Sequence, residues 1–184
     1  MTFDPHARPP IGFPCKDCRV ESAAGPYLLC YDGSEDARHA IERAGVIFGG
    51  GEALVAHVWR PPSTFSIPGK FIGDRHPLAA AAAEFDASAA EEADRIAAEG
   101  VAIASSAGFQ ATPETAKSGR GAWSALANLA EERDARAVVV GSRGGSQIRD
   151  AVLGSVAHGL VNHSTRPVLV TTHPRRAPLK PSGG

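Results

Sequence analysis

Two short apolar runs, YLLCY at 27–31 and AVVVGS at 137–142, most constrain the fold of this chain. Neither run alternates apolar with polar residues, as a strand with one face in water would. Continuous apolar runs of this length are typical of strands in a parallel sheet that is covered on both faces. Parallel strands need crossover connections, so we expect helices between the strands.

The remaining segments alternate between strand and helix patterns. Strands are predicted at 27–31, 52–59, 108–117, 137–142 and 166–172, and helices at 35–48, 78–107, 122–135 and 154–163. Ser34 is expected to cap the first helix, and Pro113 restricts the third strand to a sheet edge. The predicted fold class is α/β: a single open five-stranded parallel sheet with helices on both faces, a Rossmann-like arrangement with right-handed crossovers.

The Ala-rich segment 78–107 is predicted to be one long helix. Its apolar stripe passes through Phe85, Ala89, Ala93, Ile96, Gly100, Ile103 and Ala107. A glycine inside a helix costs about 1 kcal/mol, which close packing of Gly100 on the sheet would offset. The alternative is that Gly100 ends the helix and that VAIA, at 101–104, is a strand.

Composition changes at both ends of the chain. Residues 1–24 include RPPIGFP and lack apolar periodicity, and residues 173–184 are rich in proline, glycine and basic residues. We therefore expect one domain at 25–172, with a flexible N-terminal extension and a disordered C-terminal tail. The long loop at 60–77, with four prolines, is of a length that is usually functional or disordered.

Charge and hydropathy exclude some function classes. Nineteen basic and 20 acidic residues give a net charge of −1, which argues against a general nucleic-acid or anionic-membrane binder. No apolar run approaches the roughly 20 residues of a membrane span, and the N-terminus has no signal-peptide pattern. We therefore expect a cytoplasmic protein.

A glycine-rich loop joins the fourth predicted strand to the last predicted helix. Gly141, Gly144, Gly154 and Ser155 follow the spacing G-x-x-G, nine residues, G-S. Open α/β sheets bind ligands at the carboxyl ends of their strands, and a helix N-terminus attracts phosphate. Glycine allows close approach of the backbone and positive φ angles. The spacing predicts a phosphate site unlike the P-loop or the dinucleotide motif; the alternative is that these glycines only shape a turn.

This spacing resembles the nucleotide-binding signature of the universal stress protein family, in its ATP-binding branch. The likeness covers about residues 25–172. YLLCYDGSEDARHAI resembles the family's opening strand and Asp-Gly-Ser turn, ALVAHVWRP its second strand, and GSVAHGLVNHSTRPVLV its final helix and strand. The resemblance therefore implies the family's fold and an adenine nucleotide as ligand, namely ATP, alone or with Mg²⁺.

The resemblance also implies a set of binding residues. Asp32 would accept hydrogen bonds from the ribose, and the backbone of Val58 would contact the adenine edge. The ribose and phosphate contacts would come from Val140, Gly141, Arg143, Gly144, Gly154, Ser155, Val156 and Ala157. Cys30 and Tyr31 replace small or β-branched residues of the family, so Tyr31 is expected to crowd the adenine or to line its pocket.

A role and an assembly are implied as well. We expect a stress-response sensor or signalling module that forms a homodimer through 166–172, an apolar segment suited to pairing at a sheet edge. Apart from Asp32 and Arg143, no residue near the loop has a clear part in phosphoryl transfer, so we expect binding rather than catalysis. A cyclic-AMP-binding protein of the same fold, and a slow ATP hydrolase or transferase, remain as alternatives.

Cys15 and Cys18 form a C-x-x-C pair in the N-terminal extension. The pair supplies two of the four ligands of a structural zinc site, so a metal would need His6 or a second chain. A thioredoxin-type pair would stand at a helix start after a strand. We expect an incidental or weakly redox-active pair, with a metal shared between chains and a true redox site as alternatives, and we assign no metal-ligating residues.

Overall fold

The computed structural model describes residues 25–62, 77–119, 121–144 and 153–172. The N-terminal extension with Cys15 and Cys18, most of the loop at 60–77 and the C-terminal tail lie outside the described residues, so their expected roles stay predictions. Within the described ranges, no helix has both the length and the hydropathy of a membrane span.

Strands and helices alternate as the sequence predicts. The strands are β1 (Tyr27–Cys30), β2 (Gly51–Trp59), β3 (Phe109–Lys117), β4 (Ala137–Gly141) and β5 (Val168–Thr171), and the helices are α1 (Glu35–Phe48), α2 (Pro77–Ser106), α3 (Ala122–Glu132) and α4 (Ser155–His163). All strand pairs are parallel, in the order β3-β2-β1-β4-β5. The predicted fold class is confirmed, and β3, with Pro113, and β5 form the two edges.

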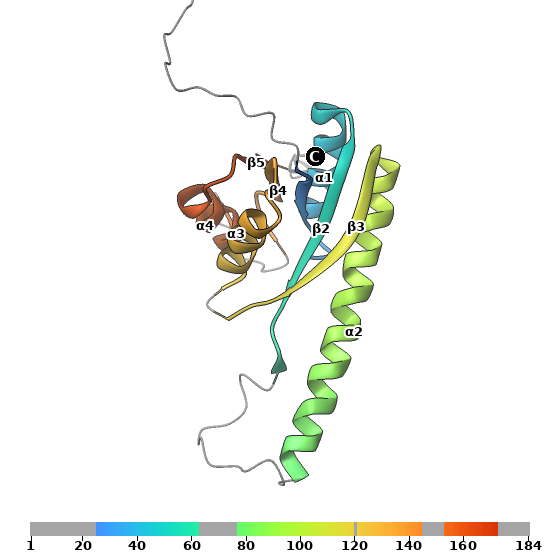
Figure 1. Ribbon diagram of the computed structural model, residues 1–184, viewed down its shortest axis with the longest axis vertical. Helices are drawn as coiled ribbons and strands as arrows, with labels where there is room; N and C mark the ends of the chain where they lie inside the picture. Colours follow the sequence, from blue (N-terminus) through green and yellow to red (C-terminus); the bar gives the residue numbers. More distant parts are fainter. Residues whose placement is uncertain (1–24, 63–76, 120, 145–152, 173–184) are drawn as a thin grey trace, which may run out of the picture.

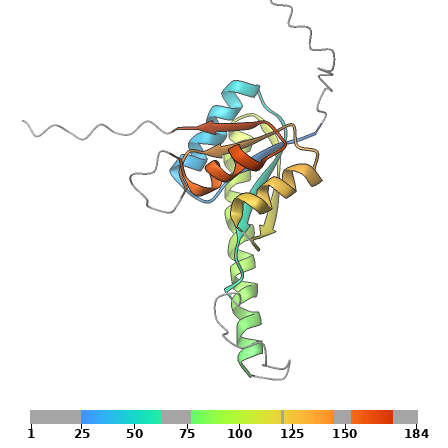
Figure 2. The same cartoon turned by 90° about the vertical axis from the view of Figure 1, so that its left-hand side faces the viewer.

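Helices cover both faces of the sheet (Figures 1 and 2), with α1 and α2 on one face and α3 and α4 on the other. Successive strand residues point to opposite faces. Leu29 therefore joins the core under α1 and α2, whereas its neighbour Leu28 joins the core under α3 and α4. Both side chains are fully buried, which explains why the run at 27–31 is continuously apolar.

The long helix α2 passes through Gly100 without a break, so the alternative of a strand at 101–104 is wrong. A Cβ atom on Gly100 would lie 2.6 Å from Cγ1 of Val55 and 2.8 Å from Cδ1 of Tyr31, which confirms the expected close packing on the sheet. The predicted stripe is wrong at Phe85, whose side chain is 66 % exposed. The reason is that the N-terminal turns of α2 extend beyond the sheet (Figure 1).

The turn after β1 fixes the start of α1 through local hydrogen bonds. Oδ1 of Asp32 accepts a bond of 3.1 Å from the backbone N–H of Ser34, and Gly33 takes a φ of +82° that favours glycine. Oγ of Ser34 then accepts a bond of 3.2 Å from the N–H of Ala37, which confirms the predicted cap. The sequence Asp-Gly-Ser thus holds Asp32 at the end of β1.

Candidate functional site

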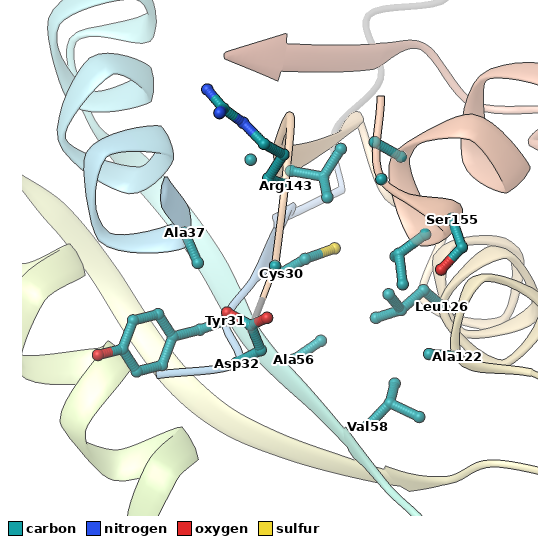
Figure 3. A pocket seen from close by; sticks show the side chains of 16 residues that line it. Cys30, Tyr31, Asp32, Ala37, Ala56, Val58, Ala122, Leu126, Arg143 and Ser155 are labelled. Atoms are coloured by element: carbon teal, nitrogen blue, oxygen red, sulfur yellow. The ribbon is translucent and has the colours of Figure 1, made fainter. Parts of the chain in front are cut away.

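A pocket lies where the strand order reverses, at the carboxyl ends of β1 and β4 (Figure 3). From β1 the chain continues to β2 and β3 on one side, and it then returns to β4 and β5 on the other. The cavity has a volume of about 170 Å³. Such a switch point is where open α/β sheets bind ligands.

The structure brings every sequence-predicted site residue to this pocket. Its lining includes Asp32, Val58, Val140, Gly141, Arg143, Gly144, Gly154, Ser155, Val156 and Ala157. They come from the ends of β1, β2 and β4, from the segment after β4 and from the first turn of α4. Residues more than 100 positions apart in the sequence, such as Asp32 and Ser155, therefore share one cavity.

Four lining residues were missed by the sequence reasoning: Ala37, Ala56, Ala122 and Leu126. They belong to α1, β2 and α3, and their side chains are small or apolar, so they narrow the cavity without any polar signal in the sequence. Leu126 lies on the predicted apolar face of α3, where pattern alone does not distinguish a core residue from a pocket wall.

Tyr31 lines the pocket, as one of its two expected roles requires, but its ring points toward α2 and away from Cys30 and Ser155 (Figure 3). The phenol O–H donates a hydrogen bond of 2.6 Å to Oε1 of Glu99. Burial and this bond raise the pKa of Tyr31 to about 12. Its backbone oxygen lies 2.9 Å from Nδ1 of the buried His57, a contact that fixes the strand end beside Asp32.

Cys30 lies on the opposite side of the strand from the Tyr31 ring, as the period of two requires. Its side chain is among those that face the pocket in Figure 3. Burial, reinforced by the negative charge of Asp32, raises the pKa of the thiol to about 12. Cys30 is therefore a protonated, apolar part of the pocket wall near neutral pH.

The glycines of the loop are needed for close approach. A Cβ on Gly144 would lie 2.5 Å from Oδ2 of Asp32, and a Cβ on Gly141 would lie 2.8 Å from the backbone of Asp36. Gly154 is less crowded, with its nearest neighbour at 3.3 Å. None of these three has a positive φ, so that expectation is wrong for them. Gly141 and Gly144 are instead required by their close neighbours. Gly145 lies outside the described residues.

Two helices begin at the pocket without a side-chain cap. Gly154 precedes α4 and donates its own N–H to the backbone oxygen of Ser142 at 2.7 Å, and Gly121 precedes α3; neither provides a side-chain hydrogen bond to its helix. Ser155 and Ala122, the first residues of these helices, both line the cavity. The partial positive charge of both helix starts is therefore directed at the pocket, which favours an anionic group there.

Arg143 lines the pocket, but its guanidinium group is directed at α1. Nε lies 3.4 Å from Oδ2 of Asp36, and the side chain extends away from Ser155 (Figure 3). Arg143, which the sequence predicts to contact a phosphate, is thus in an ion pair with the carboxylate of Asp36.

The strand order and the helices on both faces define an open α/β protein, and its described residues form a pocket at the switch point from strand ends and helix starts. Within this class, the model of the universal stress protein family matches residues 26–172. The chain belongs to the universal stress protein family.

Several solved structures have a fold similar to that of this chain. The chain is similar to the protein MJ0577 (TM-score 0.67, 19 % identity, 83 % of this chain and 99 % of that one). It is also similar to a universal stress protein from Archaeoglobus fulgidus (TM-score 0.55, 21 % identity, 79 % and 97 % covered). A universal stress protein in complex with cAMP has a TM-score of 0.51 and 26 % identity, with 80 % and 96 % covered. No curated protein matches the chain.

Proposed function

We propose that this chain is an adenine-nucleotide-binding stress-response module whose ligand is ATP, alone or with Mg²⁺. The observation that carries the proposal is that all ten residues expected for the nucleotide site line one cavity at the switch point of the sheet. The complex of a universal stress protein with cAMP, 26 % identical to this chain, supports an adenine nucleotide as the class of ligand.

The chemistry of the lining matches the parts of such a ligand. Ala56, Val58 and Leu126 offer apolar surface for a flat base, and the carboxylate of Asp32 accepts hydrogen bonds from ribose hydroxyls. The cavity of about 170 Å³ is similar to an engineered cavity of about 150 Å³ that binds benzene. It suits the base, and the phosphates would lie toward the uncapped start of α4.

We further propose binding, and not turnover, as the main role. Among the described lining residues, the side chains charged at neutral pH are Asp32 and Arg143, and Arg143 is engaged by Asp36. Phosphoryl transfer relies on groups that position the nucleophile and stabilise the charge of the transferred phosphoryl. A bound nucleotide would instead bias the conformation or the assembly of the protein.

A homodimer through β5 is part of the proposal. β5 is an edge strand that pairs with β4 alone among the described strands, and Val168, Leu169 and Val170 are half-buried. An apolar edge of this kind favours pairing with another chain. Sedimentation equilibrium of the full chain should give twice the monomer mass; a monomer over the whole accessible concentration range would contradict this part.

Cyclic AMP is the second candidate ligand, favoured by the complex named above. Mass spectrometry of small molecules released from the purified, denatured chain, followed by titration with ATP, cyclic AMP and GTP, tests the proposal. We expect ATP or ADP at near-stoichiometric yield and tighter binding of ATP than of the other two. Preference for cyclic AMP would change the proposed ligand. Sustained release of phosphate over many turnovers would contradict the proposed binding role. Failure to bind any adenine nucleotide would contradict the proposed function.

A further inference from the structure

The contact between Asp36 and Arg143 joins two segments that both enter the pocket region. Asp36 is the second residue of α1, and Arg143 follows β4. The backbone of Asp36 packs so closely on β4 that a Cβ on Gly141 would lie 2.8 Å from its carbonyl carbon. The carboxylate of Asp36 is therefore held in place by the fold beside the loop that carries Arg143.

The ion pair of Asp36 and Arg143 is mostly buried, and its atoms are farther apart than in a strong hydrogen bond. The side chain of Asp36 is 20 % exposed and that of Arg143 is 30 % exposed. The distance of 3.4 Å between Nε and Oδ2 exceeds the roughly 2.7–2.9 Å of a strong charge-assisted hydrogen bond. Oδ2 itself is buried and has no hydrogen-bond partner among the described residues. The two groups are thus held mainly by charge attraction.

A phosphate offers the guanidinium group a better partner, because planar bidentate hydrogen bonds match both shapes. If Arg143 turned to a phosphate at the start of α4, Oδ2 of Asp36 would remain buried without its cation. A buried charge that loses its partner is strongly unfavourable. Each phosphate contact made by Arg143 would therefore be weakened by the loss of the contact with Asp36.

We propose that Asp36 is a specificity-determining residue: it holds Arg143 away from the phosphate site and so lowers the affinity of the pocket for highly charged phosphates relative to the nucleoside. This inference rests on the proposed function. It adds that the ion pair with Asp36 limits how much the contact between Arg143 and the phosphates contributes to binding. Asp36 acts through Arg143 and is not itself in the lining of the cavity.

The experiment compares adenosine, AMP and ATP on the full chain by calorimetric titration. In Asp36→Asn, ATP affinity should rise about 3- to 10-fold, the size of effect expected from a partly buried charge pair. AMP affinity should rise less, and adenosine affinity should stay within about 2-fold. Arg143→Gln should lower ATP affinity, and in this background Asp36→Asn should have little further effect, because the group that it releases is gone.

Glu35→Gln is the matched control. Glu35 stands in the same first turn of α1, and its side chain is 83 % exposed, with Arg38 as its ion-pair partner at 3.9 Å. The Glu35→Gln substitution removes one negative charge from the same end of α1 but leaves the contact between Asp36 and Arg143 in place. It should therefore leave the ratio of ATP to adenosine affinity unchanged. Thermal unfolding of both variants checks that the fold is retained.

The outcomes separate this inference from the proposed function. An unchanged or lower ratio of ATP to adenosine affinity in Asp36→Asn would overturn it while leaving nucleotide binding intact. An equal rise of this ratio in Glu35→Gln would also overturn the inference, because the loss of any negative charge at this helix end would then explain the effect. Failure of the wild-type chain to bind adenosine, AMP and ATP would overturn the proposed function itself, and with it this inference.

Discussion

Gly144 and Asp32, on neighbouring strand exits, are in such close contact that a methyl group on Gly144 would lie 2.5 Å from Oδ2 of Asp32. The same carboxylate accepts a hydrogen bond from the backbone of Ser34 through Oδ1. The loop after β4 and the turn after β1 therefore fix each other, and the missing side chain at Gly144 decides where the carboxylate of Asp32 lies in the pocket.

Gly144→Ala should thus displace Asp32 with little effect on folding. We expect ATP affinity to fall by about tenfold or more, because small displacements of a binding group are costly in a preorganised site. Gly119→Ala is the control, since a Cβ there meets nothing within 4 Å. Calorimetric titration of both variants makes the comparison, and equal ATP affinities would contradict the role assigned to this contact.

Gly141→Ala should act on stability. Its methyl group would lie 2.8 Å from the backbone carbonyl of Asp36, and backbone moves less easily than the end of a side chain. We expect the free energy of unfolding to fall by about 1–3 kcal/mol, the usual range for overpacking. Urea unfolding measures this change, and a loss below about 0.5 kcal/mol, the range of neutral surface changes, would show that α1 adjusts freely.

The fold was predictable because its strongest signals are local. Leu28 and Leu29 are both buried, on opposite faces, so an uninterrupted apolar run was the correct sign of a central parallel strand. The ten site residues were predicted as a set because the resemblance to the universal stress protein family implies them. They meet in the fold because the carboxyl ends of parallel strands share one edge of the sheet, where α4 also begins. Phe85 was misplaced because periodicity shows which side of a helix is apolar but not how far the sheet beneath it extends.

The details of the site depend on contacts between distant segments, which the sequence alone does not reveal. Ala37 and Ala122 have no polar group that would mark them as pocket residues. The ion pair of Arg143 with Asp36 joins two residues that lie far apart in the sequence. The direction of the Tyr31 ring was available from strand alternation, since Tyr31 lies two residues after Leu29 and shares its face.

Stability should decline at high pH because of Tyr31. Its pKa rises from 10.0 to about 12 in the folded chain, so the unfolded chain loses the phenol proton first. The contribution of the protonated Tyr31 phenol to the free energy of unfolding is complete below pH 10 and is lost as the pH approaches 12. Tyr31→Phe should therefore show a shallower loss of unfolding free energy over this window than the wild type, when both retain Cys30. Identical slopes would contradict the raised pKa.

The thiol of Cys30 should resist alkylation in the native chain. The thiolate is the reactive form, and burial raises the pKa of Cys30 from 9.0 to about 12. In a chain with Cys15→Ser and Cys18→Ser, modification by iodoacetamide at pH 8 should be at least about 100-fold slower than in urea. Comparable rates in the two conditions would show that the pocket wall opens readily.

The central claim is that the pocket at the switch point binds ATP. Amide NMR spectra of the isotope-labelled chain, recorded during an ATP titration, test both the binding and its place. We predict saturable shifts that are largest at Asp32, Val58, Gly144, Ser155 and Val156, with smaller changes in the groove that Arg38, Glu42 and Glu99 form between α1 and α2. Spectra that do not change, or that change most in that groove, would contradict the account.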